Sequence, residues 1–583
     1  MEMAEIPTTP PPLQGPSSKE KKYDRQLRLW AAAGQEALEN AHVLLLNSGC
    51  GVVGVEILKN LILPGVGRFT IYDPKTVTEE DLGVNFFLDE DSLGQSRAER
   101  TCALLQELNP DVRVDFKSES INELVSEPAN LDPYTLILVT SPVERRRGTE
   151  PLAFDKVLEY AQLHDVPMIY VLSIGFYSSF SLFLPAIFPI VETHPDPTST
   201  TDLRLLNPWP ELLDFVKEKT EHLDQLDDHD HGHVPYLLLL LHYLDEWKAA
   251  HGGRPPENYK EKTEFREWVR KGARTNNSEG AEENFDEAVA AVLKNLNPPS
   301  LSSSVREVVE SDECRNLQKG SANFWFITSA IKTFYTNHSV LPLPGSLPDM
   351  KAQSADYIRL QNIYKAKARK DVAEVLATVR ELEGSLSHDV PIDEKEVEAF
   401  CKGAAFIKVI QGRKTLQSKH YDMPEWGDRA KSFFTALQDP TSLAPLYIAL
   451  YTYDSHRQLD KPPPSPPPTK TTDDIASIKN ATCSQAHAII ESLWADNGHD
   501  LNAELANANA TDDDDDVRAL KTRVEQYVAE IVRAGEGELH NVAALTGGMV
   551  AQEAIKVMTR QYVPVDNVCV FDGVTSRVGV FKR

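Results

Sequence analysis

The sequence lacks several features that would place it in a common functional class. Among its 583 residues, 60 are Lys or Arg and 88 are Asp or Glu, which gives a formal net charge of −28. Such a chain repels phosphate backbones and anionic lipid headgroups, so DNA, RNA and membrane surfaces are poor partners. The six cysteines have no Cys-x-x-Cys spacing. This argues against a disulfide framework and a thiolate zinc site, and it indicates reduced, intracellular thiols.

Long apolar runs are also missing. The most apolar stretch, residues 236–241 (YLLLLL), is far shorter than the roughly 18 residues that suggest a membrane span, so we expect a buried helix there. Residues 1–20 are rich in Pro, Thr and Ser and contain no apolar core of a signal peptide. We therefore expect a disordered tail at this end and a protein of the cytoplasm or the nucleus.

The first two hundred residues alternate between strand and helix patterns. The chain is longer than the roughly 250 to 300 residues that one core supports, so at least two cores are expected. Apolar, β-branched runs typical of buried strands occur at residues 42–47, 68–72, 112–116, 135–139 and 167–171. Helical stretches separate several of these runs. This alternation predicts an α/β fold with a doubly wound, mostly parallel Rossmann-like sheet.

The pattern changes after about residue 185. Apolar residues then recur with a period of 3.6, for example over residues 285–296 and 372–382, which predicts a largely helical region. The end of the chain returns to α/β character, with a helix rich in small residues over 542–559 and a strand over 569–573. The last helix and strands therefore belong to the α/β domain, and the helical region interrupts it.

This pattern divides the chain into parts. We expect an α/β domain made of residues 21–184 and 536–583, and a large helical domain over residues 185–535 inserted into it. Within the insert, the proline-rich residues 462–468 and the acidic residues 507–516 are expected to form exposed loops. Biased tracts of this kind are usually spacers, so we assign them no binding role.

A glycine turn follows the first expected strand. Gly49, Gly51 and Gly54 form the pattern Gly-x-Gly-x-x-Gly, and Asp73 ends the second strand. In such a turn the backbone approaches a phosphate at a helix N-terminus, and the carboxylate reaches a ribose hydroxyl. The pattern fits a nicotinamide oxidoreductase, an adenylating fold with a live site, or an adenylating fold whose site has lost its activity.

Residues 22–30 (KYDRQLRLW) resemble the opening segment of ubiquitin-like-protein-activating enzymes, which have a ThiF/MoeB-like fold. Further segments that match this family in order and spacing are residues 56–61, 83–87, 94–99 and 552–556. The insert is similar to that of the regulatory, non-catalytic subunits of Nedd/Rub-type modifier-activating enzymes. The matching segments are residues 193–196, 207–212, 347–350 and 400–406. SUMO-type subunits, whose insert is much shorter, are the alternative within the family.

The family's adenylation chemistry uses ATP and magnesium, and this chain departs from its pattern at four positions. Val84 stands where an arginine contacts phosphate, and Pro142 stands where an aspartate binds magnesium. Arg97 replaces the catalytic lysine, and Val52 replaces a glycine that lets the nucleotide lie close. We therefore interpret the glycine turn and Asp73 as a degenerate site that does not bind ATP productively.

The resemblance implies that a partner subunit carries the chemistry. The thioester step of the family uses a cysteine preceded by histidine, and the sequence contains no such dipeptide. We expect Cys401, in an apolar stretch, to be buried and unreactive. The chain would then pair with a catalytic subunit that binds ATP and magnesium and activates the Nedd/Rub-type modifier of cullins. Within this heterodimer, Arg25 matches the arginine that crosses to the partner's ATP phosphates.

One segment carries many metal-ligand side chains. Residues 227–233 (DDHDHGH) alternate Asp and His, but they show no helix or strand pattern that would hold ligands in place. A tight metal site needs preset ligands and a supporting shell, so we expect a solvated loop and no bound metal.

Overall fold

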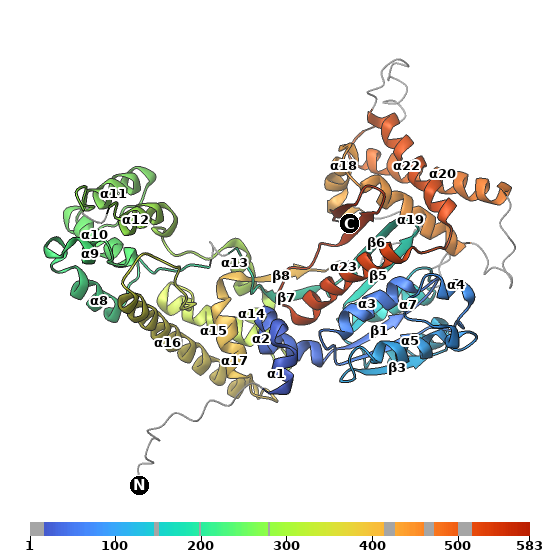
Figure 1. Cartoon of the computed structure of the whole chain (residues 1–583), viewed down its shortest axis with the longest axis horizontal. Helices are drawn as coiled ribbons and strands as arrows, with labels where there is room; N and C mark the ends of the chain where they lie inside the picture. Colours follow the sequence, from blue (N-terminus) through green and yellow to red (C-terminus); the bar gives the residue numbers. More distant parts are fainter. Residues whose placement is uncertain are drawn as a thin grey trace, which may run out of the picture. The chain divides into compact units, whose positions relative to one another are not determined.

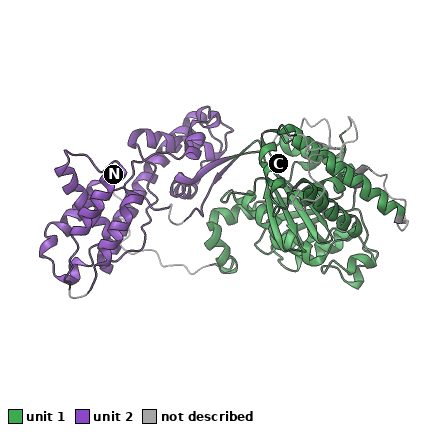
Figure 2. Cartoon of the chain, turned by 90° about the horizontal axis from the view of Figure 1, so that it is seen from above, with its two compact units in different colours: residues 1–188, 410–583 green, residues 189–409 purple. Residues whose placement is uncertain are grey.

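The computed structural model describes residues 17–144, 151–196, 200–277, 280–412, 426–459, 472–499 and 516–582. The chain divides into two compact units, coloured separately in Figure 2. Unit 1 comprises residues 1–188 and 410–583, and unit 2 comprises residues 189–409. The chain leaves unit 1 along strand β7 (Ile187–Val191) and returns along β8 (Ile407–Gln411), and these two strands pair with each other.

Unit 1 is built on an eight-stranded sheet with the order β10-β9-β6-β5-β4-β1-β2-β3 (Figure 1). Its strands are β1 His42–Leu46, β2 Arg68–Tyr72, β3 Arg113–Lys117, β4 Leu136–Thr140, β5 Met168–Ile174, β6 Tyr177–Phe183, β9 Val568–Asp572 and β10 Arg577–Phe581. The first five strands pair in parallel, whereas β6 and β10 run antiparallel to their neighbours. The prediction of a doubly wound α/β sheet is confirmed, with an antiparallel side added to it.

The N-terminal segment of unit 1 and its C-terminal segment contribute helices beside the strands. They are α1 Ser18–Lys22, α2 Asp24–Glu39, α3 Val52–Ile62, α4 Glu79–Leu82, α5 Arg97–Gln106, α6 Ile121–Leu124, α7 Ala153–Leu163 and α23 His540–Thr559, with 3-10 turns at Glu90–Ser92 and Pro128–Leu131. Helices α3 and α23 pack side by side, because Gly547 lets Glu56 approach its backbone; a Cβ at Gly547 would lie 2.7 Å from the Glu56 Cβ. Segments from the two ends of the chain therefore form one layer (Figure 1).

A second group of helices also belongs to unit 1. They are α18 Ala430–Gln438, α19 Ala444–Leu459, α20 Thr472–Asp496 and α22 Asp516–Ala534, after a 3-10 turn at Gly427–Arg429. Phe433, Leu446 and Trp494 share a core with Ile174 and Val570 of the sheet. This corrects the expectation of one helical insert over residues 185–535. Helical periodicity shows that a segment buries one face, but it does not show which partner covers that face.

Unit 2 is helical and has two apolar cores. Its helices are α8 Pro210–Thr220, α9 Asp228–His231, α10 Tyr236–Ala250, α11 Tyr259–Lys271, α12 Glu283–Asn295, α13 Ser303–Glu310, α14 Asp312–Arg315, α15 Asn323–His338, α16 Ser354–Leu386 and α17 Glu394–Lys402, with 3-10 turns at Leu223–Gln225 and Ala404–Phe406. The leucine run of residues 236–241 is buried in α10, as the sequence predicts. In the described part of the chain, no helix is long and apolar enough to cross a membrane.

The start of the chain differs in part from the expected tail over residues 1–20. Helix α1 begins at Ser18, because Ser17 and Glu20 form a capping box in which each side chain accepts the other residue's backbone N–H. Residues 1–16 lie outside the described residues. The predicted loops over 462–468 and 507–515 lie outside them as well, and Asp516 begins α22.

The Asp/His-rich segment over residues 227–233 is not the solvated loop that we expected. It contains the short helix α9, capped by the Asp227 side chain, which accepts from the backbone N–H of Asp230. His231 is 2% exposed, and its Nδ1 lies 2.8 Å from the Glu282 Oε1. A tertiary contact 51 residues away therefore orders this segment, and local periodicity carries no sign of such a contact. Across the described ranges, no cluster of His, Cys, Asp and Glu side chains has the arrangement of a metal site.

Candidate functional site

The glycine turn follows β1, the strand at which the order of strand addition reverses from one side of the sheet to the other. Strand β1 pairs with β2 on one side and with β4 on the other, so the loops after these three strands meet at the carboxyl edge of the sheet. Gly49 has a φ of +62° and Gly51 a φ of +70°, which are conformations that favour glycine. Gly51 precedes the first residue of α3, so the backbone N–H groups of this helix face the turn. The fold thus builds the scaffold of a nucleotide site.

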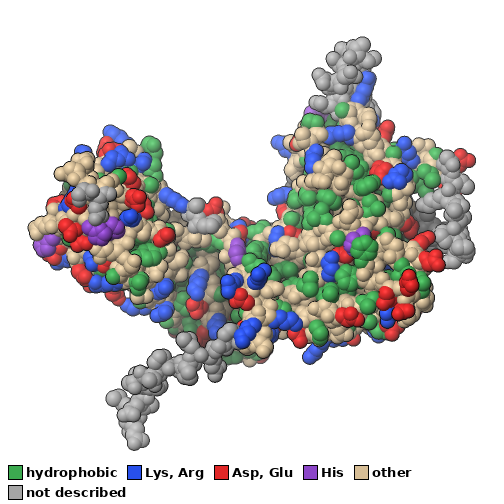
Figure 3. Space-filling view, viewed as in Figure 1, with side chains coloured by type: hydrophobic (Ala, Val, Ile, Leu, Met, Phe, Trp, Pro, Cys, Tyr) green, Lys and Arg blue, Asp and Glu red, His purple; other side chains and the backbone are tan. Residues whose placement is uncertain are grey.

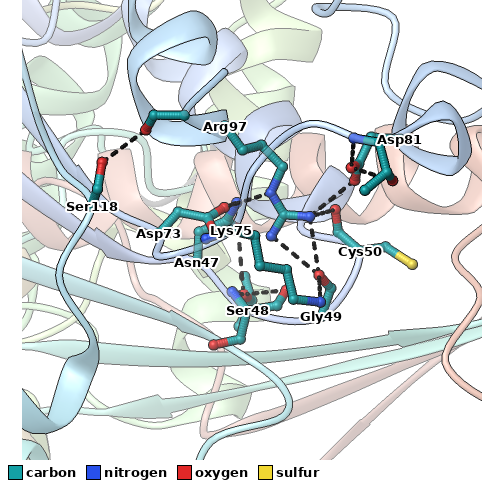
Figure 4. Close-up of polar contacts among 12 residues, drawn as sticks. Asn47, Ser48, Gly49, Cys50, Asp73, Lys75, Asp81, Arg97 and Ser118 are labelled. Carbon is teal, nitrogen blue, oxygen red and sulfur yellow. Dashed lines mark hydrogen bonds and ion pairs between the residues drawn. The ribbon is translucent and has the colours of Figure 1, made fainter. Parts of the chain in front are cut away.

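An arginine fills that scaffold (Figure 4). Arg97, the first residue of α5, is 1% exposed, and its guanidinium group points at the turn. Its Nε donates to the Asp73 Oδ2 at 2.7 Å, and Nη1 donates to the Cys50 carbonyl at 3.0 Å. Nη1 and Nη2 also donate to the Gly49 carbonyl, at 3.2 and 3.1 Å. The side chain therefore occupies the space beside the turn and satisfies the carbonyls of the turn.

Asp73 is fully engaged within the chain. Its Oδ2 also accepts from the Asn47 Nδ2 at 2.9 Å, and its Oδ1 accepts from the Lys75 backbone N–H at 3.0 Å. Arg97 bonds a second carboxylate, that of Asp81, at 3.0 Å. Both Asp73 oxygens thus have partners inside the protein, which leaves the carboxylate unavailable to a ribose hydroxyl. This arrangement disfavours the nicotinamide alternative.

The electrostatics of this cluster favour a charged, closed network. Burial lowers the pKa of Arg97, but the neighbouring carboxylates of Asp73 and Asp81 raise it by more, so the net pKa shift is upward. A buried guanidinium between two buried carboxylates is stabilising only while every partner is present, because a charge left alone in the interior is costly. The cluster holds the turn together and offers no free cation to a phosphate.

The other departures from the family pattern surround the same place. Val52 is 1% exposed and begins α3, and the ring of Pro142 packs against the turn, where a Cβ on Gly49 would lie 3.2 Å from its Cδ. The Val84 carbonyl lies 3.1 Å from the His540 Nδ1. The structure therefore places Val52, Pro142 and Arg97 at the glycine turn, whereas the contact of Val84 is with His540. The substituted side chains supply no phosphate or magnesium ligand.

Arg25 is presented differently. It lies in the first turn of α2, between Tyr23 and Trp30, both of which are buried. Tyr23 accepts from the Asn109 Nδ2 at 3.0 Å, and Trp30 donates to the Gln35 Oε1 at 3.0 Å. Arg25 itself is exposed, and it has no hydrogen bond or ion pair to another described residue. Two buried aromatic side chains thus anchor a segment that exposes a cation with no partner in this part of the chain.

The thiols of Cys401, which is buried, and Cys50, which is partly buried, are poor nucleophiles. Burial raises the pKa of Cys401 to about 12, and it also raises the pKa of Cys50 in the glycine turn. The thiolate is the reactive form of cysteine, so these shifts suppress reactivity. Cys401 thus has the surroundings of a structural cysteine.

Sequence reasoning missed one residue of this site. Glu538 lies 485 residues after Val53, yet its Oε2 accepts the Val53 backbone N–H at 2.9 Å, at the N-terminus of α3. No local motif marks Glu538, because it precedes α23 in a connecting segment of ordinary composition. Only the return of the chain to unit 1 places it at the turn.

Comparison with known proteins gives consistent results over the whole chain. A sequence model of the ThiF family matches residues 23–583. The NEDD8-activating enzyme E1 regulatory subunit of Xenopus laevis is 34% identical over 571 residues, covering 97% of this chain and 98% of that protein. Proteins with the same name from Danio rerio (35%, covering 97% and 99%) and Drosophila melanogaster (36%, covering 97% and 98%) are equally similar. Among solved structures, E. coli MccB covers 29% of this chain and 47% of its own length at 20% identity, with a TM-score of 0.24.

Proposed function

Because this chain belongs to the ThiF family and to the NEDD8-activating enzyme E1 regulatory subunits, we propose that it acts as the non-catalytic half of a heterodimer. The other half, a catalytic subunit, adenylates the C-terminus of NEDD8 with ATP and forms a thioester on its own cysteine. The product feeds the modification of cullins. In this proposal the chain alone is inactive, and both ATP and magnesium belong to the partner.

The state of the glycine turn is the observation that carries the proposal. Adenylation builds up negative charge on phosphate, which cations and a metal ion must stabilise. Here the cation next to the turn, Arg97, is committed to Asp73 and Asp81. Pro142 and Val84 offer no ligand at the places where magnesium and phosphate would be held. The residues of this chain therefore do not fit ATP and magnesium, which favours a partner that supplies the live site.

In this proposal, Arg25 reaches into the active site of the partner subunit. An arginine aimed at transferring phosphate stabilises the charge of the transition state, as an arginine finger does. Such a residue must be exposed, must be free of local ion pairs and must sit on a rigid element. Arg25 is exposed on a segment that the buried side chains of Tyr23 and Trp30 anchor, and it has no ion pair among the described residues, whereas Arg28 on the same helix bonds Asp24 at 2.9 Å. We assign to Arg25 the contact with the ATP phosphates in the partner's site.

Exposed apolar side chains on unit 1 support pairing with another subunit. Hydrophobic side chains gather on unit 1 in the view of Figure 3. Phe86 is 69% exposed, although it stacks on His540 at the start of α23, and Leu545 on the same helix is 47% exposed. Large exposed apolar side chains on neighbouring segments mark interaction surfaces. Obligate partners bury more than the roughly 1,600 Å² of a standard interface, and the buried area is largely apolar.

The six cysteines without pairing spacing fit a heterodimer that works in the cytoplasm or the nucleus.

The decisive experiment is ATP-dependent thioester formation on a candidate catalytic subunit, with and without this chain. We expect a thioester with NEDD8 only when both subunits are present, and none with ubiquitin or a SUMO-type modifier. Thioester formation by this chain alone would overturn the proposed division of labour. A thioester with a SUMO-type modifier would assign the chain to the alternative enzyme.

A further inference from the structure

The segment that joins α22 to α23 crosses the mouth of the glycine turn. Residues 535–538 are held there from three sides. Tyr453 donates its hydroxyl to the carbonyl of residue 535 at 3.2 Å, and the Gly175 backbone N–H donates to the carbonyl of residue 537 at 2.8 Å. The Cys50 thiol, inside the turn, donates to the carbonyl of residue 536 at 3.1 Å. The segment is thus a fixed strap over the turn.

The last residue of this strap, Glu538, points its carboxyl group at the start of α3. The carboxyl group is buried, and it accepts the Val53 N–H at 2.9 Å. Burial raises the pKa of Glu538 to about 7, while the backbone N–H groups of Val53, Val52 and Gly51 and the charge of Arg97 act in the opposite direction. The carboxyl group of Glu538 is therefore buried at the N-terminus of α3, where the Val53 N–H donates to it.

This place is where the fold would hold an anion. The first N–H groups of a helix have no partner within the helix, and the aligned peptide dipoles favour negative charge at this end. After a Gly-x-Gly-x-x-Gly turn, those N–H groups bind the phosphates of a nucleotide. In this chain a side-chain carboxyl group makes the contact that a phosphate oxygen would make.

We propose that Glu538 is a built-in ligand of the glycine turn. Its carboxyl group takes the phosphate position at the N-terminus of α3, and Arg97 fills the adjoining space beside Asp73. The turn therefore stays folded without a nucleotide, and ATP can enter only if the strap is displaced. This inference deepens the proposed non-catalytic role and rests on it. It can be tested with this chain alone and an anion of the phosphate class.

The proposal differs from simple capping of α3 in what removal of the carboxyl group does. A cap only adds stability, so its loss weakens the protein and creates no new property. An internal ligand that is removed leaves an empty set of donors, which an external anion can then use. The two interpretations therefore predict different binding, and not only different stability.

The first test is the binding of inorganic phosphate and of ATP to the full chain, measured by titration calorimetry. We expect Glu538→Ala to bind inorganic phosphate roughly tenfold more tightly than the unmodified chain, because it frees the helix N-terminus. Glu536→Ala is the matched control, since it removes an exposed carboxylate of the same strap and should bind as the unmodified chain does. A folded Glu538→Ala variant with no gain in phosphate binding would overturn the proposal.

A second variant and a measurement without mutation keep the test open if Glu538→Ala does not fold. Glu538→Ser retains an oxygen that can accept one N–H while it vacates the anion position, and we expect the same gain in phosphate binding. In the unmodified chain, millimolar phosphate or ATP should leave hydrogen exchange over residues 51–55 unchanged. Slower exchange there would refute the proposal by showing that an external anion already binds. That result would leave the thioester experiment unaffected, so the failure of one idea is distinguishable from the failure of the other.

Discussion

The glycine turn and the segment around Arg25 each place an arginine at a position of the family's pattern, and the two arginines have opposite surroundings. At the turn, Arg97 is 1% exposed and bonded to Asp73, Asp81 and two carbonyl groups. On α2, Arg25 is exposed, without a partner among the described residues. Arg97 is bonded entirely within its own chain, whereas the guanidinium group of Arg25 is accessible from outside.

The difference between Arg97 and Arg25 separates a residue that holds the fold together from one that is available to a ligand. A buried polar group that is fully hydrogen-bonded within the chain contributes to folding, because its removal would leave its partners unsatisfied. An exposed cation without an ion pair contributes little to folding, so it can be used by an external ligand at little cost in stability. Burial and partners, more than sequence likeness, separate the two roles.

The largest effect should come from breaking the filled site. Arg97→Ala leaves the buried carboxylates of Asp73 and Asp81 without their cation, and we expect unit 1 to lose about 3–5 kcal/mol of stability. Hydrogen exchange of the β1 and β2 amides as a function of denaturant measures this loss. Arg100→Ala on the same helix is the control, because Arg100 pairs with Asp89 at 3.4 Å near the surface and should cost less than about 1 kcal/mol. Equal losses would contradict the structural role of Arg97.

The next effect concerns the exposed arginine. Arg25→Ala should leave the stability of the chain unchanged and lower the rate of NEDD8 adenylate formation by the reconstituted heterodimer roughly 10³-fold, as expected for loss of an arginine finger. Pyrophosphate exchange measures this rate. Arg28→Ala removes a neighbouring arginine that is already paired with Asp24, and it should change the rate little. An unchanged rate with Arg25→Ala would show that Arg25 does not act on the partner's ATP.

A smaller effect should appear in the pH dependence of stability. The pKa of Glu538 is raised by burial to about 7, above its ordinary value of 4.5. A raised carboxyl pKa in the folded state means that stability is greatest below pH 4.5 and falls as the pH rises through 7. Relative to Glu538→Gln, which does not titrate, the chain should lose roughly 3 kcal/mol between pH 4.5 and about pH 8. Parallel denaturation series of the two proteins measure this difference, and identical pH profiles would contradict it.

The smallest effect should come from restoring one lost residue. Val84→Arg returns a cation to the position that contacts phosphate in the family, yet Arg97 and Glu538 still occupy the site. We expect no measurable ATP binding by calorimetry with this variant. ATP binding after this single change would show that the site is open and that only the missing charge keeps ATP out.

Much of the α/β architecture was predictable because its signals are local. The strands of the first half are short apolar runs, and the glycine turn is a contiguous motif. Other elements gave no such signal. Strand β6 (Tyr177–Phe183) contains three serines, and only its place between β5 and β9 makes it part of the sheet. The polar segment around His231 predicts a solvated loop, but the His231 side chain is buried against the distant Glu282.

The sequence alone determined which chemical groups this protein has. The arginine, valines and proline at family positions predict a chain without its own adenylation chemistry, and the missing His-Cys dipeptide predicts that it lacks the thioester-forming cysteine. The resemblance of the segment around Arg25 predicts a role in trans. Only the tertiary structure decided where the groups lie. It placed helices α18, α19, α20 and α22 in unit 1 and brought Glu538 to the start of α3, because packing and hydrogen bonding between distant segments depend on the whole fold and leave no local pattern.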